Sequence, residues 1–176
     1  MTARHRGPAP SLLQSDRLLL RPTTIEDVDA LLGVFGDPRV MAAFGEGPFD
    51  RPQMEHWVRG NLAHLEEHGY GPFTVIHRED GLVIGDVCLE HMDIDGVPEL
   101  ELGYDLRSDH WGRGLATEAA CLVRDHAFDV IGAARLISIV RSGNAASARV
   151  AEKVGMSFER DLNRWGISYR LYAVER

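Results

Sequence analysis

Lysine is almost missing from this sequence, in which Lys153 is the single example among 176 residues. A P-loop requires the pattern GxxxxGK[ST], whose lysine reaches the nucleotide phosphates, and this pattern does not occur. The pattern GxGxxG, which is typical of dinucleotide-binding domains, is absent as well. These absences argue against both common nucleotide-binding loops.

Cysteine is also scarce, and no apolar run approaches the ~20 residues of a membrane-spanning helix. Cys88 and Cys121 lack the spacing of metal ligands, which indicates reduced thiols and a cytoplasmic location. The first ten residues lack the apolar core of a secretory signal. We expect a loose N-terminal tail at residues 1–12 and a single domain at 13–176, because 19.6 kDa suffices for a substantial core.

Positive charge is in deficit too, because 19 Lys and Arg stand against 27 Asp and Glu, a net charge of −8. Nucleic-acid binding needs clustered cations that contact phosphates, so no nucleic-acid partner is expected. A negative field favours a cationic ligand such as a protonated amine, but the same charge can serve solubility alone. The sequence leaves both explanations open.

What the sequence does contain is a glycine-rich turn that opens a predicted helix, in the run from His110 to Glu118. Gly112 and Gly114 have no Cβ, so a ligand can approach the backbone closely. The first amides of a helix have no intrahelical partner and lie at the positive end of its dipole. The run is therefore typical of a phosphate-binding site, and an ordinary helix start is the alternative.

Residues 99–106, upstream of this turn, alternate strictly between apolar and polar side chains. The alternation predicts a strand with one core face and one polar face. Glu99, Glu101 and Asp105 lie on the predicted polar face. Acidic side chains therefore lead towards the turn on the side of the strand that faces away from the core.

Residues 133–140, downstream of the turn, predict an apolar strand, and a helix that ends at Gly155 follows it. Asn144 is a natural N-cap for that helix, and Ser147 shares its face at i, i+3. The remaining patterns predict further strands and helices, with a loop region at 36–50. The strands are expected at 17–21, 73–77, 82–92, 157–159 and 168–174, and the helices from 23 or 24 to about 35 and from 50 to about 68.

The run from Trp111 to Ala116, with the strand before it and the Asn-x-x-Ser helix after it, resembles the GNAT acyltransferase superfamily. The RimJ/RimL-like branch, which includes acetyltransferases of ribosomal-protein N-termini, often has this Trp-Gly-x-Gly-x-Ala-Thr-Glu form. Trp111 stands where many members carry Gln or Arg. The likeness follows the same order over residues 99–158, and more faintly from Asp16 to the C-terminus.

The resemblance implies the GNAT fold, an α/β (α+β) architecture. Its central sheet is mixed and mostly antiparallel, has about six to seven strands and is splayed in the middle, with helices on both faces. The splay is expected between the 99–106 and 134–140 strands, where it receives the pantetheine arm of CoA.

The resemblance also implies an acetyl-CoA-dependent N-acetyltransferase that acts by direct attack in a ternary complex. The acceptor is a primary amine, either a protein or peptide N-terminus or a small molecule, and the protein is a monomer or a homodimer. A non-catalytic acyl-CoA-binding sensor is the alternative. Because CoA is anionic, a local basic patch near Arg113 has to oppose the net charge.

Two groups of site residues follow from the resemblance. The predicted CoA-binding residues are Trp111, Gly112, Arg113, Gly114, Leu115, Ala116, Thr117 and Asn144. Glu101 is the expected general base, directly or through a water molecule, and the alternative is that it only hydrogen-bonds the amine or pairs with an arginine. Glu99 competes for this role, whereas Asp105 is expected to support local structure.

Ser147 is expected to donate a proton or a hydrogen bond to the leaving thiolate, with Tyr169 and Tyr172 as rivals. No metal is expected. His64 and His68 have the i, i+4 spacing of a metal pair, but nothing resembles HExxH, and a solvated helix face is the preferred interpretation. His110 is interpreted as a turn residue without a catalytic role.

Overall fold

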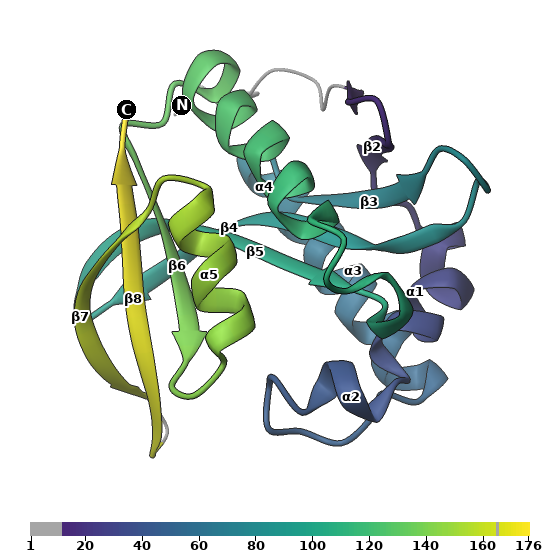
Figure 1. Cartoon of the computed structure of the whole chain (residues 1–176), viewed down its shortest axis with the longest axis horizontal. Helices are drawn as coiled ribbons and strands as arrows, with labels where there is room; N and C mark the ends of the chain where they lie inside the picture. The colour runs from purple at the N-terminus through teal and green to yellow at the C-terminus, as the bar shows by residue number, and fades with distance from the viewer. Residues whose placement is uncertain (1–11, 165) are drawn as a thin grey trace, which may run out of the picture.

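The computed structural model describes residues 12–164 and 166–176, so residues 1–11 of the expected N-terminal tail lie outside the described residues. The described residues form one eight-stranded sheet in the order β1-β2-β3-β4-β5-β6-β8-β7 (Figure 1). The strands are β1 (Leu13–Gln14), β2 (Leu18–Pro22), β3 (Pro72–His77), β4 (Val83–Ile94), β5 (Val97–Leu106), β6 (Arg135–Arg141), β7 (Ser157–Arg164) and β8 (Ile167–Glu175).

The sheet contains one strand more than the six to seven that were expected. The additional strand, β1, has two residues and pairs with Leu19 and Leu20 at the edge of the sheet. Two residues are too short to show an alternating pattern, so the sequence does not predict this strand. The other seven strands fall on the predicted segments, although β7 continues to Arg164.

The sheet is splayed between β5 and β6, as the resemblance implies. In the described residues these neighbours run parallel and share the single ladder pair Glu101 and Ile137. The antiparallel neighbours β4 and β5, by contrast, stay paired over the whole length of β5. Figure 1 shows β6 and β8 turning away from β4 and β5. Beyond Glu101, the carboxyl end of β5 is therefore open on the β6 side.

Helices cover both faces of the sheet (Figure 1). The nearer face in that view carries α4 (Leu115–His126) and α5 (Ala145–Lys153), and the far face carries α1 (Val28–Phe35) and α3 (Arg51–His68). A one-turn helix, α2 (Pro38–Met41), follows α1. None of the helices in the described ranges combines the length and the hydropathy that a membrane span requires.

The alternation of β5 decides which of its side chains face which helices. Leu102 and Leu106 are buried in the core that includes Leu115 and Ala119 of α4. Glu101, which directly precedes Leu102, therefore faces the side of α1 and α3. The predicted division into a core face and a polar face is confirmed, and the polar face is the one that α1 and α3 cover.

One segment differs from the expected loop at 36–50. Residues 38–41 form a turn of helix, because the Asp37 carboxylate accepts a hydrogen bond from the Arg39 amide at 2.9 Å. Pro38 suits the first helical position, where its missing N–H costs no hydrogen bond. Short polar caps of this kind stabilise one turn without any apolar periodicity, so the sequence pattern does not reveal the helix.

Candidate active site

The glycine-rich turn enters α4 in a backbone conformation that favours glycine. Gly112 and Gly114 have φ angles of 74° and 78°. Among the described residues no side chain caps α4, and the Glu118 amide donates to the Gly114 carbonyl at 3.1 Å. The amides of residues 115–117 precede this bond and have no intrahelical partner. They form a positive end that is available to an anion.

Two hydrogen-bonding side chains hold the turn in place, and sequence reasoning singled out only one of them, Trp111. Arg17, just before β2, donates to the Arg113 carbonyl at 2.9 Å and pairs with the Glu118 carboxylate. The indole nitrogen of Trp111 donates to the Leu106 carbonyl at 2.8 Å. The turn is therefore fastened both to the start of β2 and to the end of β5.

A groove of about 770 Å³ opens beside this turn, between α4, the start of α5 and α2, and its size is that of a small-molecule site. Arg113 is not among the residues that line it. The other seven predicted CoA-binding residues do line it: Trp111, Gly112, Gly114, Leu115, Ala116, Thr117 and Asn144.

The cations of the groove come from outside the glycine-rich run. Arg39 of α2, Arg141 at the end of β6, and Arg149 and Lys153 of α5 all line it. Arg149 and Lys153 are four residues apart and share one face of α5. That spacing is visible in the sequence, but only the fold brings Arg39 and Arg141 to the same place. A chain with a net charge of −8 thus has a locally basic groove.

Glu101 lies at the point where β5 and β6 separate. One of its carboxylate oxygens accepts a hydrogen bond from the Ile139 amide at 3.2 Å, and the Ser138 hydroxyl donates to the Leu102 carbonyl at 2.5 Å. These side chains bridge the two strands where the backbone ladder stops. Burial raises the pKa of Glu101 to about 7, against the Ile139 hydrogen bond, which lowers it.

Asp105, four residues further along β5 on the same face, lines the groove, whereas Glu101 does not. Burial raises the pKa of Asp105 to about 7. Asp86 stands directly opposite on β4, is 2% exposed, and has one carboxylate oxygen without a hydrogen-bond partner in the described residues. Burial, and then the charge of Asp105, raise its pKa well above the ordinary value.

Asp86 is a residue that sequence reasoning missed. It lies within an apolar strand, and an isolated acid at a core position is a signal in itself, since a buried carboxyl group needs a reason. Its pairing with Asp105 could not be foreseen, because it depends on the register between β4 and β5. The two carboxyl groups make Asp105 a rival to Glu101 as the base, in place of the structural role expected of it.

Glu99, the other predicted rival, is engaged elsewhere. Both of its carboxylate oxygens accept hydrogen bonds from the Arg135 guanidinium at 3.2 Å. Arg135 also pairs with Glu159 of β7 and Glu175 of β8. Glu99 is therefore part of an ion-pair network that joins the strands on the other side of the splay, which makes it a poor base.

Ser147 and Asn144 lie at the start of α5, beside the groove. The Asn144 side chain accepts a hydrogen bond from the Ser147 amide at 3.1 Å, which confirms the predicted N-cap. The Ser147 hydroxyl donates to the Tyr104 hydroxyl at 3.2 Å, and Tyr104 donates in turn to the Ser147 carbonyl at 2.8 Å. Burial raises the pKa of Tyr104 to about 12, although the hydrogen bond with Ser147 lowers it.

Tyr104 lines the groove. The alternation of residues 99–106 places this side chain on the core face of the strand and gives no sign of that position. The predicted tyrosine rivals lie on β8, and within the described residues neither lines the groove. Tyr172 is 3% exposed and packs edge to face against Phe158, while Tyr169 packs with a cluster of β6 and β7 side chains. Ser147 and its neighbour Tyr104 thus lie beside the groove, whereas Tyr169 and Tyr172 do not.

The predicted solvated face of α3 is only partly confirmed for its histidines. His56 is exposed, but His64 and His68 are half-buried in a stack of rings with Tyr70 and His91. The ring nitrogens of His64 lie within hydrogen-bond distance of the Tyr70 carbonyl at 3.1 Å and the His91 amide at 3.0 Å. Because both nitrogens of His64 have partners, this pair is not arranged as metal ligands.

Comparison with known proteins gives a consistent picture. The family model described as "Acetyltransferase (GNAT) domain" matches residues 17–157. The chain is 30% identical over 165 residues to the uncharacterised protein YkkB of Bacillus subtilis, covering 93% of this chain and 95% of that protein.

Solved structures are similar as well. An acetyltransferase from Agrobacterium tumefaciens is 32% identical, with a TM-score of 0.81 over 94% of this chain and 95% of that one. RimL, a ribosomal-protein acetyltransferase solved in complex with coenzyme A, has a TM-score of 0.78 over 94% of this chain and 98% of that one. Its identity of 18% supports the shared fold alone.

Proposed function

The chain belongs to the GNAT acetyltransferase family, and we propose that it transfers the acetyl group of acetyl-CoA to a primary amine by direct attack within a ternary complex. We assign this activity to a single domain of residues 13–176. The observation that carries the proposal is the basic groove, which runs from the uncapped start of α4 to the opened end of β5. An anionic, elongated ligand fits both its charge and its course.

The groove residues divide the binding of acetyl-CoA between them. The amides of residues 115–117 would hold the pyrophosphate, because they combine free donors with the positive end of the α4 dipole. Arg149 and Lys153 would contact further phosphate oxygens, and Asn144 would lie beside the pantetheine. Acetyl-CoA itself supplies the thioester, whose carbonyl carbon is the electrophile.

Glu101 would act as the general base. A primary amine with a pKa of about 10.4 is protonated near neutrality and has no lone pair for attack. A carboxylate whose pKa is about 7 can accept that proton at the pH of the reaction, whereas an ordinary glutamate would hold it too weakly. Asp105, with a similarly raised pKa and a place in the groove wall, would hold the ammonium group before the proton leaves.

Ser147 would stabilise the thiolate as the carbon–sulfur bond breaks. Its hydroxyl already donates to Tyr104, so a small rotation would redirect that donor to a sulfur atom in the groove. Tyr104 would in turn hold Ser147 through the carbonyl contact at 2.8 Å. Glu101 takes the first proton from the ammonium group, and the neutral nitrogen then forms the new bond to the carbonyl carbon. As the carbon–sulfur bond breaks, the second nitrogen proton goes to the hydrogen-bonded thiolate, which leaves as the thiol of CoA.

The acceptor is expected to be cationic, because carboxyl groups with raised pKa values face it from β4 and β5. A turnover assay tests both the activity and the acceptor. The full chain is mixed with acetyl-CoA and a panel of amino acids, polyamines, aminoglycosides and peptides with free N-termini, and thiol release is measured. We expect saturable release with one of these classes. Tight acetyl-CoA binding without acceptor-dependent release would overturn the proposal and favour the acyl-CoA sensor.

A further inference from the structure

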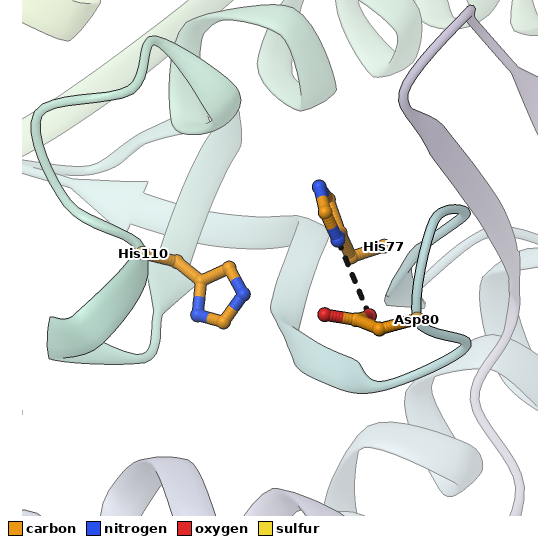
Figure 2. Close-up of side chains that lie close together, drawn as sticks. All are labelled: His77, Asp80 and His110. Carbon is orange, nitrogen blue, oxygen red and sulfur yellow. Dashed lines mark ion pairs between the residues drawn. The ribbon is translucent and has the colours of Figure 1, made fainter.

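Three side chains that the proposed reaction does not use converge beside the groove. His77 ends β3, Asp80 lies in the following turn, and His110 immediately precedes the glycine-rich turn. One nitrogen or oxygen atom from each lies within 4.8 Å of the other two. Figure 2 shows the three side chains turned towards a common space, with one ring nitrogen of His110 directed at the other two.

His77 is buried, and one of its ring nitrogens is unsatisfied. The residue is 3% exposed, and its Nδ1 atom has no hydrogen-bond partner in the described residues. That nitrogen lies 3.2 Å from Asp80 Oδ1, yet the direction of the ring nitrogen does not meet the geometry of a hydrogen bond. The two groups therefore lie close together without a regular hydrogen bond, as two ligands of one ion do.

His110 is oriented by a carboxylate on its far side. Its Nδ1 lies 2.8 Å from Asp109 Oδ1, and Arg107 clasps the same carboxylate at 3.1 and 2.9 Å. With Asp109 as acceptor, Nδ1 carries the proton and Nε2 keeps a free lone pair. Histidines that bind metal ions are oriented in the same way, by a carboxylate on the nitrogen opposite the ion.

We propose that His77, Asp80 and His110 form a binding site for a divalent transition metal ion, with Zn²⁺ as the first candidate. Two imidazoles and one carboxylate are a common zinc ligand set, and bonds of ~2.0–2.1 Å put neighbouring ligand atoms roughly 3.4 Å apart. The His77–Asp80 distance of 3.2 Å already has this value. The His110 atom lies within 4.8 Å of the other two, so small rotations of the side chains, including that of Asp80, which is 41% exposed, would complete the set.

The site would fasten two segments that are distant in the sequence. His77 and Asp80 belong to the β3–β4 hairpin, whereas His110 leads directly into Trp111 and the glycine-rich turn. An ion held by both would brace the start of the turn from the β3–β4 hairpin, in addition to Arg17, which already holds it through the Arg113 carbonyl. The metal site is independent of the acetyl transfer proposed above, because none of its three ligands has a role in that reaction.

Titration of the chelator-treated full chain with ZnCl₂ by calorimetry, and with CoCl₂ by visible absorption, tests the proposal. We expect one ion per chain, a Co²⁺ spectrum typical of mixed nitrogen and oxygen ligands, and a higher Tm with Zn²⁺. Asp80→Asn should weaken Zn²⁺ binding at least tenfold or so without unfolding the protein, because the amide oxygen can still accept from Leu82 as Asp80 does at 3.1 Å.

Two further variants separate this site from other histidines. Asp109→Asn should weaken Zn²⁺ binding by about 10–100-fold, as loss of an orienting carboxylate does at metal sites. His68→Ala is the matched control, since His68 belongs to the other histidine cluster and should leave binding unchanged. The proposal is overturned if the wild type binds neither ion, or if His68→Ala abolishes binding while Asp80→Asn retains it.

Discussion

The groove and the neighbouring sheet face carry opposite charge, although both meet at the splay. In the groove, the uncapped amides of α4 act together with four cationic side chains from α2, β6 and α5. On the sheet face beneath α1 and α3, β4 and β5 carry the acidic side chains Asp86, Glu90, Glu101 and Asp105. The net charge of −8 describes neither the groove nor the sheet face. The position of the charges, rather than their sum, indicates which ligands each region can bind.

The acidic face itself contains carboxylates of two kinds. Asp27 accepts hydrogen bonds from Arg21 at 2.7 and 2.5 Å and from Thr74 at 3.0 Å. Burial opposes its ionisation, but these bonds keep the pKa of Asp27 below the ordinary value. Thr74 pairs with Asp86, which pairs with Asp105, but these two form no ion pair within the described residues, and their pKa values are raised. Carboxyl groups that a fold leaves without a cation mark a candidate site.

The strongest test of this comparison removes the charge of Glu101. Glu101→Gln keeps an oxygen for the Ile139 amide but cannot accept a proton, so we expect kcat to fall by ~10²–10⁴-fold. Acetyl-CoA affinity should stay nearly unchanged, because Glu101 does not line the groove. In the wild type, kcat should fall as the pH drops below about 7, where the carboxylate becomes protonated, and Glu101→Gln should lose this dependence.

Glu99→Gln is the matched control, because Glu99 shares the face but is bound to Arg135. Its kcat should stay close to that of the wild type. Asp105→Asn should raise KM for the amine more than it lowers kcat, since Asp105 would hold the ammonium group. If Glu101→Gln keeps a normal kcat and Asp105→Asn loses it, the base is Asp105 and the assignment to Glu101 is wrong.

A second test concerns the donor at the start of α5. Ser147→Ala removes one hydroxyl and preserves the helix, because alanine has the highest helix propensity. We expect kcat to fall by roughly 10–10³-fold, the range of one lost electrostatic contact in a transition state. Tyr104→Phe breaks the contact with the Ser147 carbonyl and should cause a smaller loss. Tyr169→Phe and Tyr172→Phe should behave like the wild type, and a large loss in either would place the donor on β8.

A third test concerns the basic groove and the free amides at the start of α4. Gly114→Ala adds a Cβ at a φ of 78°, beside the free amides of α4, and should weaken CoA binding by about tenfold in calorimetry. Gly96→Ala is the control, because Gly96 has a φ of 85° in the turn between β4 and β5. Both variants carry a similar strain of about 1–2 kcal/mol, so Tm should fall in both. Equal CoA affinities in the two variants would contradict the role of the α4 amides.

Local patterns account for the parts of the site that lie within one segment. The alternation of residues 99–106, the glycines before α4 and the Asn144 cap all follow from periodicity or from single-residue conformational preferences. The resemblance over the whole chain adds the splay between β5 and β6, which no local pattern contains. These features position most of the groove, because they fix the elements on two of its sides.

The remaining features depend on contacts between segments that are distant in the sequence. Asp86 faces Asp105 only because β4 and β5 pair in one particular register. Tyr104 reaches Ser147 across 43 residues, and His77 reaches the turn at His110 from another hairpin. A shift of one residue in a strand would turn these side chains to the opposite face. Sequence periodicity places a side chain on a face but does not choose its partner there.

The smallest expected effect concerns how Asp86, on the acidic sheet face, changes the stability of the protein with pH. The pKa of Asp86 is raised in the folded protein above the ~3.9 of an unfolded chain. Its contribution to stability is therefore fully present below about pH 4 and is lost as the pH rises through the raised pKa. Asp86→Asn cannot ionise and escapes this loss. We expect its Tm to exceed that of the wild type by about 2–4 °C at about pH 8, the effect of ~1 kcal/mol in a domain of this size, and the gap to close at about pH 4.

Asp16→Asn provides the control, because Asp16 is exposed and its replacement should shift Tm equally little at both pH values. Thermal unfolding followed by circular dichroism across this pH range measures both variants. A Tm difference for Asp86→Asn that does not change with pH would mean that Asp86 is neutral or fully solvated at every pH. In that case the acidic face would owe its charge to Glu90, Glu101 and Asp105, and the contrast with Asp27 would rest on those three residues.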